Sequence, residues 1–411
     1  MRNERRRFLG AAGCAAALAT LGGCRLTLEH GISNPCRTPL PDALSRHEAV
    51  RAAWEGIDAA RVWDSHAHLL GTGDSGSGIW LNPGMSSVLR PVQLAQRLFF
   101  LNAACVDQTP GRVDESYVER MRTLIEGMPA GVKVVLLAFE RAYTEDGEPS
   151  PAGTSLHVPD GFVMAVARRH PDHFEWAASI HPYRRDCVDA LHAAKANGAR
   201  AVKWLPAAMS IDPASPRCDA FYAALKDADL PLITHAGAES AVPVGDRQHL
   251  GNPLLLRRAL EHGVRVVVAH CATMGQDRDL DRGADGPWVE SFSLFARLMD
   301  EARFARNLYG DLSAVAQVNR AGPALVRLLE REDWHARLLN GSDYPLPGVM
   351  PLFSMDQLAQ LRVIEPGLGP VLAAIREHNP LLFDFVLKRH LRSGNARFPR
   401  RVFETRAFFA P

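Results

Sequence analysis

Two histidines separated by one residue, His66 and His68, follow an apolar stretch that ends at Trp63. In a β-strand, residues two positions apart point to the same side, so Asp64, His66 and His68 are expected on one face. Imidazole nitrogens bind divalent metals such as zinc, iron, manganese or nickel. The spacing therefore indicates a metal site at the end of a strand. We expect Asp64 to orient the backbone or a ligand histidine rather than to bind the metal.

Four further candidate residues each stand at the end of an apolar run of their own. Lys203, His235, His270 and Asp343 follow one another at intervals of 32, 35 and 73 residues. A strand followed by a helix takes roughly 30 or more residues, so the last interval holds about two such units. The candidates are thus expected at the ends of strands n, n+1, n+2 and n+4.

The elements that position these residues alternate along the chain. Amphipathic stretches such as 187–197 and 252–262 are each followed by a glycine, a signal that ends helices, and they separate short apolar runs typical of buried parallel strands. This alternation predicts an α/β fold, a (β/α)8 TIM barrel with extra C-terminal helices in 353–395. A doubly wound open sheet is the alternative, but it brings fewer strand ends together. The strands are expected near 62–66, 132–139, 174–180, 199–204, 231–235, 264–269, 307–312 and 336–341.

The order of these motifs resembles the amidohydrolase superfamily over about residues 60–390. The local sequences AVKWLP at 201–206 and GSDYP at 341–345 are most similar to its amidohydrolase-related branch, which includes aminocarboxymuconate-semialdehyde decarboxylase-like proteins. The resemblance implies a metal site with four protein ligands: His66, His68, His235 and Asp343.

The resemblance leaves two residues with alternative roles. His270 is either a ligand of a second metal or a hydrogen-bond donor to the reacting oxygen. Lys203 is either carboxylated, bridging two metals, or a free amine that acts on the substrate. The site is thus expected to hold one or two divalent ions, with zinc as the first expectation and manganese, iron or nickel as alternatives.

The chemistry expected of this site is hydrolysis of an amide, ester or lactone-type bond in a small molecule. A bound metal lowers the pKa of its water, Asp343 moves the proton, and the metal or His270 stabilises the developing oxyanion. The expected catalytic residues are therefore Asp343, His270 and Lys203. A metal-dependent decarboxylase of the same superfamily is one alternative. A metal-holding binding protein without turnover is an alternative of a different class.

The N-terminus carries the signals of an exported protein. The sequence RRRFLG at 5–10 resembles the twin-arginine export motif, and LGGC at 21–24 resembles a lipobox with Cys24 as the lipidated residue. We expect export by the twin-arginine route to the periplasm or cell envelope, with contact to the membrane only through a lipid at Cys24. The predicted divisions are a signal at 1–24, a tether and N-terminal extension at 25–59, the metal-dependent barrel at 60–395 and a C-terminal tail at 396–411, which is expected to clamp the surface.

The composition fits one large globular enzyme. The 411 residues include 47 Lys and Arg against 46 Asp and Glu, so no net field favours nucleic acid as a partner. No C-x-x-C motif is present, and although an oxidising compartment permits a disulfide, the sequence leaves the pairing open. Cys271 is expected to be a small buried residue. The glycine- and serine-rich segment 71–83 is either a mobile lid or a solvated connector.

Overall fold

The computed structural model describes residues 34–410 and forms a barrel of eight parallel strands, as the sequence predicts. The predicted export signal and Cys24 lie outside the described residues. Each strand overlaps its predicted position; the first ends two residues later than predicted, and the other seven are shorter than expected at one or both ends. The strands are β1 (Trp63–His68), β3 (Lys133–Leu137), β5 (Phe174–Ala177), β6 (Val202–Trp204), β7 (Leu232–His235), β8 (Val266–Ala269), β11 (Leu308–Asp311) and β12 (Leu338–Leu339).

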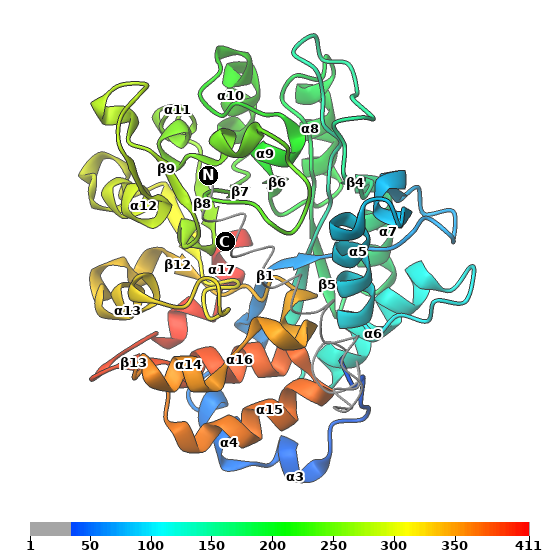
Figure 1. The fold of residues 1–411 in the computed structure, drawn as a ribbon, viewed down its shortest axis with the longest axis vertical. Coiled ribbons are helices and arrows are strands. Elements are labelled where there is room, and N and C mark those ends of the chain that lie inside the picture. The colour runs from blue at the N-terminus through cyan, green and yellow to red at the C-terminus, as the bar shows by residue number, and fades with distance from the viewer. Residues whose placement is uncertain (1–33, 411) are drawn as a thin grey trace.

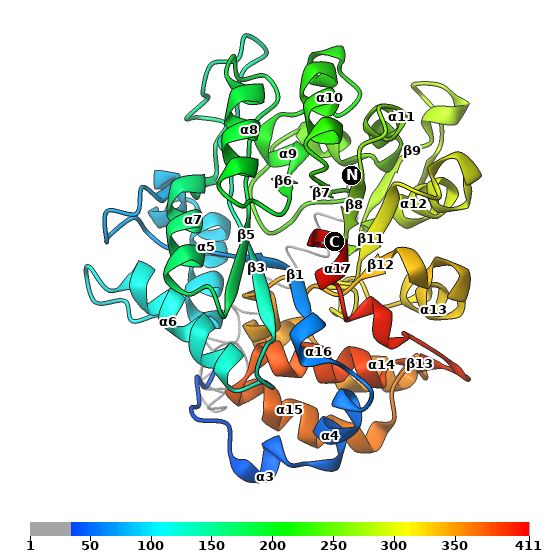
Figure 2. The same ribbon diagram turned by 180° about the vertical axis from the view of Figure 1, so that it is seen from behind.

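Two short pairings close the ring. The strands run in the order β1-β3-β5 and β6-β7-β8-β11-β12, and parallel bridges between Ala178 and Val202 and between Ala67 and Tyr344 join the two arcs. Beside the second bridge, the backbone N–H of Asp343 donates to the carbonyl of His66 at 2.7 Å. A doubly wound sheet has two free edges, so this closure excludes it. Figures 1 and 2 show the strands at the centre and the helices around them.

The helices between the strands follow the predicted alternation, with two local differences. In 252–262 a 3-10 turn, Pro253–Leu256, precedes the α-helix, because Asn252 caps the Leu254 N–H at the start of that turn. The amphipathic pattern of 288–302 also predicts a helix, but its first three residues form β10 (Trp288–Glu290), which pairs with β9 (Gln276–Arg278). The helices are α6 (Val113–Glu126), α7 (Asp160–Arg169), α8 (Cys187–Ala196), α9 (Pro206–Met209), α10 (Asp219–Asp227), α11 (Arg257–Glu261), α12 (Ser291–Asp300) and α13 (Pro323–Glu330).

The side chains that point into the barrel form a small apolar core. The residues two positions further along each strand point the same way and reach the barrel mouth. Ala201 and Ile233 belong to this core. Because side chains alternate along a strand, Lys203 and His235, two residues further on, point the same way at the carboxyl end. Phe409 of α17 (Arg406–Phe409) is buried in this same core. The C-terminal tail therefore packs into the barrel instead of only clamping its surface.

The long connection between β1 and β3 adds a layer beside the barrel. It holds β2 (Trp80–Leu81), which pairs with β4 (Leu156–His157), and α5 (Pro91–Ala103). The buried carboxylate of Asp114 accepts hydrogen bonds from the backbone of residues 72, 73 and 75 and from the hydroxyls of residues 75 and 77. The segment 71–83 is thus a pinned connector and not a free lid. A disulfide joins Cys36 to Cys105 at the far end of α5.

The C-terminal helices pack on the outside of the barrel, as expected for 353–395. They are α14 (Met355–Gln360), α15 (Gly369–His378) and α16 (Pro380–His390), followed by the hairpin of β13 (Arg392–Ser393) and β14 (Ala396–Arg397). The N-terminal helix α4 (Glu48–Trp54) lies against α16, where Trp54 stacks on Phe385 with ring centroids 4.0 Å apart. No helix among residues 34–410 is both long and apolar enough to cross a membrane.

Candidate metal centre

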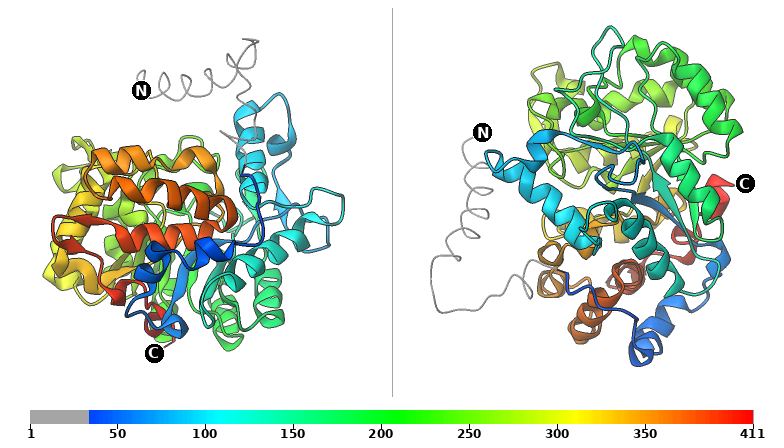
Figure 3. Two further views of the ribbon diagram at one scale, coloured as in Figure 1. Left: turned by 90° about the horizontal axis from the view of Figure 1, so that it is seen from below. Right: turned by 90° about the vertical axis from the view of Figure 1, so that its right-hand side faces the viewer.

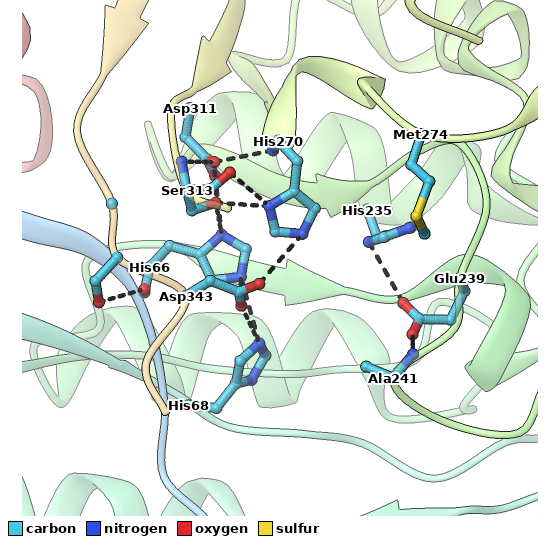
Figure 4. A network of polar contacts seen from close by, with 12 residues as sticks. His66, His68, His235, Glu239, Ala241, His270, Met274, Asp311, Ser313 and Asp343 are labelled. Atoms are coloured by element: carbon cyan, nitrogen blue, oxygen red, sulfur yellow. Dashed lines mark hydrogen bonds and ion pairs between the residues drawn. The ribbon is translucent and has the colours of Figure 1, made fainter. Parts of the chain in front are cut away.

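Three side chains from the two joined ends of the barrel converge at its mouth. His66 and His68 come from β1, and Asp343 follows β12. The Nε2 atoms of the two histidines are 3.3 Å apart, and they lie 3.5 and 3.3 Å from Asp343 Oδ1 (Figure 4). Two imidazole nitrogens and a carboxylate oxygen at this spacing are a donor set that suits a divalent cation. The types of donor atom in these three side chains therefore fit a bound metal ion.

A second carboxylate orients His66. Asp311 Oδ2 lies 2.9 Å from His66 Nδ1, and both side chains are fully buried. A proton held on Nδ1 by this contact leaves the Nε2 lone pair directed at His68 and Asp343, which is the arrangement that metal-binding histidines use. The sequence reasoning missed Asp311. The available signal was its place at the end of the seventh predicted strand, where the other candidate residues also stand.

His270 lies on the other side of Asp343. Its Nε2 is 3.7 Å from Asp343 Oδ2, and its Nδ1 is 2.8 Å from the hydroxyl of Ser313. The backbone at His270 and at Asp343 has φ of 57° and 60°, a region that non-glycine residues rarely adopt. Such conformations cost energy and persist where the surroundings impose them, often at functional sites.

Asp64 holds the two ends of the barrel together, as the sequence suggested for this residue. Its Oδ1 accepts the backbone N–H of His66 at 3.1 Å and that of Ser342 at 2.8 Å. A Cβ on Gly341 would stand 2.7 Å from the Cβ of His66, so only glycine permits this approach. Together these contacts fix Asp343 relative to β1.

Lys203 lies inside the barrel beneath the histidines. Its side chain is fully buried, and its Nζ is 3.1 Å from His66 Nε2. Burial lowers the pKa of Lys203 to about 8, although Asp311 and Asp343 act in the opposite direction. A lysine of this kind spends part of its time as the neutral amine near pH 7. The structure thus places Lys203 within the predicted site.

His235 is at the same mouth but faces a different partner. Its Nδ1 is 3.5 Å from Glu239 Oε2, and its Nε2 is 3.3 Å from the carbonyl of Ala238. The ring centroid lies 5.3 Å from that of His270. Among the described residues His235 does not belong to either group of mutually close donor atoms, so its role as a metal ligand stays a prediction. The sequence reasoning also missed the buried Glu239.

A sequence model of the family described as amidohydrolase matches residues 63–381, which include the whole barrel and every residue of this cluster. The chain belongs to the amidohydrolase family. This confirms the resemblance seen in the sequence and agrees with the closed barrel. No curated protein matches the chain.

Solved structures similar to this amidohydrolase share little sequence with it. An uncharacterised TIM-barrel protein from Bordetella bronchiseptica is 18% identical, with a TM-score of 0.44 over 80% of this chain and 99% of that one. A probable 2-pyrone-4,6-dicarboxylic acid hydrolase from Acinetobacter baumannii is 14% identical, with a TM-score of 0.43 over 74% and 92%. A 5-carboxyvanillate decarboxylase from Novosphingobium aromaticivorans with bound manganese is 11% identical, with a TM-score of 0.43 over 85% and 97%.

Burial holds His68, His235 and His270 of this amidohydrolase in the neutral state that metal binding requires. Burial lowers the pKa of His68 to about 4 and that of His235 to about 3. Burial opposes the ionisation of Asp343, but His270, His68 and His66 outweigh it and hold the pKa of its carboxyl well below the usual range. At pH 7 the site therefore presents imidazole lone pairs and a carboxylate.

A buried arginine, which sequence reasoning did not identify, adds positive charge beside this cluster. Arg320 is only 9% exposed, and its Nε and Nη1 atoms have no hydrogen-bond partner among the described residues. Its charge contributes, after burial, to the low pKa of His235 and of His270. A guanidinium is costly to bury without a partner, so these N–H groups are available to an anion.

Proposed function

We propose that this amidohydrolase is a metal-dependent hydrolase of an amide, ester or lactone-type bond in a small molecule. The observation that carries the proposal is the convergence of His66 Nε2, His68 Nε2 and Asp343 Oδ1 within 3.3 to 3.5 Å of one another. Zinc is the proposed ion, because nitrogen and carboxylate donors in a buried site suit it.

A divalent metal held by His66, His68 and Asp343 supplies a coordinated water of lowered pKa and polarises a substrate oxygen. Asp343 has the role of proton carrier, since its ionised carboxylate accepts a proton from the attacking water and returns it to the leaving group. Asp311 keeps the His66 ring in one orientation through the 2.9 Å contact at Nδ1.

His270 has two tautomers that correspond to its two expected roles. When Nδ1–H donates to the Ser313 carbonyl at 3.1 Å, the Nε2 lone pair is free for a second ion. When the Ser313 hydroxyl donates to Nδ1 at 2.8 Å, Nε2–H is free to donate to an oxyanion that develops on the substrate.

Arg320 is the group we propose for substrate binding. Its two nitrogens without a hydrogen-bond partner among the described residues, Nε and Nη1, are suited to a carboxylate or another anionic oxygen. This observation also favours the second candidate function, a decarboxylase, since such an enzyme must bind a carboxylate-bearing substrate. Replacing Arg320 by Met is expected to raise KM for an anionic substrate about tenfold or more, and to change KM for a neutral ester much less.

One experiment separates the candidate functions. Metal-replete enzyme is incubated in ¹⁸O-labelled water with lactones, esters, amides and carboxylated aromatic compounds. Hydrolysis introduces ¹⁸O into the acid product, whereas decarboxylation releases carbon dioxide. Chelated enzyme and the Asp343→Asn variant are the controls, and full activity in metal-free enzyme contradicts the proposal. Bound metal without turnover of any compound favours the metal-holding binding protein.

We also propose that the protein is exported by the twin-arginine route and anchored by a lipid at Cys24. The motifs at 5–10 and 21–24 support this, as does the disulfide between Cys36 and Cys105, which suits an oxidising compartment. Replacing Arg5 and Arg6 by Lys is expected to retain the protein in the cytoplasm, and Cys24→Ser to release it from membranes. Unchanged fractionation of either variant contradicts the corresponding step.

A further inference from the structure

Exposed apolar side chains gather at the start of α5. Among residues 34–410, five large hydrophobic side chains are exposed, and four of them lie between positions 88 and 98. Figure 3 shows this light-blue segment at an edge of the molecule, projecting beyond the ring of helices. A cluster of apolar side chains exposed to water marks a site that binds another protein or a membrane. We call it the α5 patch: Val88 (80% exposed), Leu89 (87%), Val92 (45%) and Leu98 (46%).

The stretch of chain that carries the α5 patch is positively charged. The stretch 80–103 contains Arg90 and Arg97 and no acidic residue. Arg90 is exposed and directly follows Leu89. Apolar side chains next to arginines are typical of segments that lie in the interface of an anionic lipid bilayer.

The first described residues of the chain are bonded to the C-terminal end of α5, opposite the α5 patch. The backbone N–H of Asn34 donates to the Asn102 side chain at 2.8 Å, and the disulfide links Cys36 to Cys105. From Cys24 to Asn34 there are only ten residues, which span about 35 Å when fully extended. The thirteen residues of α5 are about 20 Å long. A lipid on Cys24 therefore keeps the whole helix within reach of the bilayer.

We propose that the α5 patch inserts into the surface of the anionic membrane to which the Cys24 lipid anchors the protein. The proposal rests on the lipidation proposed above and adds a second, non-covalent contact to it. α5 also touches the barrel mouth, since the Gln96 side chain donates to the Ser240 carbonyl at 2.8 Å. Docking through α5 thus places the entrance of the catalytic barrel beside the membrane.

The test uses an environment-sensitive fluorophore on the mature, lipidated protein. Leu89→Cys is labelled and bound to vesicles of phosphatidylethanolamine and phosphatidylglycerol, with and without nitroxide groups on the acyl chains. The free cysteines among the described residues, Cys187, Cys218 and Cys271, are buried and do not compete for the label. Asn395→Cys, in the exposed hairpin between β13 and β14, is the matched control.

The expected result is a blue shift and an intensity rise of about twofold for the label at position 89, with quenching by the nitroxide lipids and no change at position 395. Vesicle flotation is measured in parallel. A protein that floats while the label at position 89 stays water-like overturns the docking and leaves lipidation intact. A protein that does not float overturns the lipidation and the docking with it.

Two other occupants of the patch give a different signature. If a second copy of the chain or residues 25–33 cover the α5 patch, the label shifts but the nitroxide lipids do not quench it, and the proposal is wrong. As an independent check, the unlabelled lipidated protein and its variant with Val88→Ser and Leu89→Ser are compared by circular dichroism and by vesicle leakage of a trapped dye. A folded double variant that disturbs vesicles as strongly as the parent also contradicts the docking.

Discussion

Charged side chains meet in two places at the carboxyl end of the barrel, and they meet in opposite ways. After β3 and β5 they line a cavity of about 530 Å³, where Arg184 pairs with Glu140 and with Asp186 at 2.7 Å each. After β1 and β12, by contrast, His66, His68 and Asp343 bring three metal-binding donor atoms together, and no arginine pairs with them.

This difference separates a structural ion cluster from a metal site. In the cavity after β3 and β5, opposite charges satisfy one another, and Arg184 provides the positive charge. At the histidine cluster the nearest amine, Lys203 Nζ, has a pKa lowered by burial to about 8, so it loses its charge more readily than an exposed lysine. Imidazole and carboxylate donors that converge on one point suit a divalent cation, so the second cluster is the one that fits a metal.

The largest expected effect compares one carboxylate from each place. Asp343→Asn removes the proton carrier and a metal donor, so kcat/KM should fall by about 10³-fold or more. Glu140→Gln weakens an ion pair and should cost less than about tenfold. Steady-state kinetics on the first substrate found, with metal content by elemental analysis, measures both. Equal losses in the two variants would mean that the two clusters do not differ in their role in turnover.

The second effect concerns the residue that orients His66. Asp311→Asn removes the charge beside His66 Nδ1 and should weaken metal affinity about 10- to 100-fold. Competition with a chromophoric chelator measures this affinity. Asp277→Asn is the control, because Asp277 is also buried and hydrogen-bonded, at 2.7 Å to Ser291, but lies outside the histidine cluster. An affinity unchanged in the Asp311 variant would remove Asp311 from the site.

The third effect is a pH dependence of the free energy of unfolding. It arises from Asp160, which lines the cavity after β3 and β5. Burial raises the pKa of Asp160 from 3.8 to about 7, so between these values the folded chain binds a proton that the unfolded chain releases. This contribution to the free energy of unfolding is complete below pH 3.8 and is lost as the pH rises through 7.

The test compares wild type with Asp160→Asn, which stays neutral at every pH. From pH 4 to pH 8 the wild type should lose about 3 to 4 kcal/mol of stability relative to the variant, as denaturant titrations measure. Metal-free protein is used for both, so that loss of metal in acid does not enter the difference. A difference in stability that is constant with pH would show that Asp160 is ionised throughout.

The smallest effect decides between one metal and two. If Lys203 is carboxylated and bridges two ions, Lys203→Ala should halve the metal content per chain, and short carboxylic acids should partly restore it. If Lys203 is a free amine, wild type and variant both hold one ion. Elemental analysis with native mass spectrometry, which detects the added carbon dioxide, measures both quantities. One ion per chain in both proteins refutes the bridge.

Much of the site was predictable because it depends on local order. The apolar runs fix where strands end, and strand ends of a barrel meet at one face whatever the detailed packing. His66, His68 and Asp343 were therefore placed together from spacing alone, as was Lys203, and the role of Asp64 followed from its position beside them.

Other features were decided only by the tertiary structure. Asp311 is 245 residues from His66, and its hydrogen bond depends on how two distant strands pack. Arg320 and Glu239 lie on loops whose paths no periodicity describes, and the pairing of Cys36 with Cys105 follows the path of α5. The sequence by itself determined the barrel, its strand ends and the residue types gathered there. The tertiary structure decided which way each ring faces, because a side chain takes its orientation from neighbours that are remote in the chain.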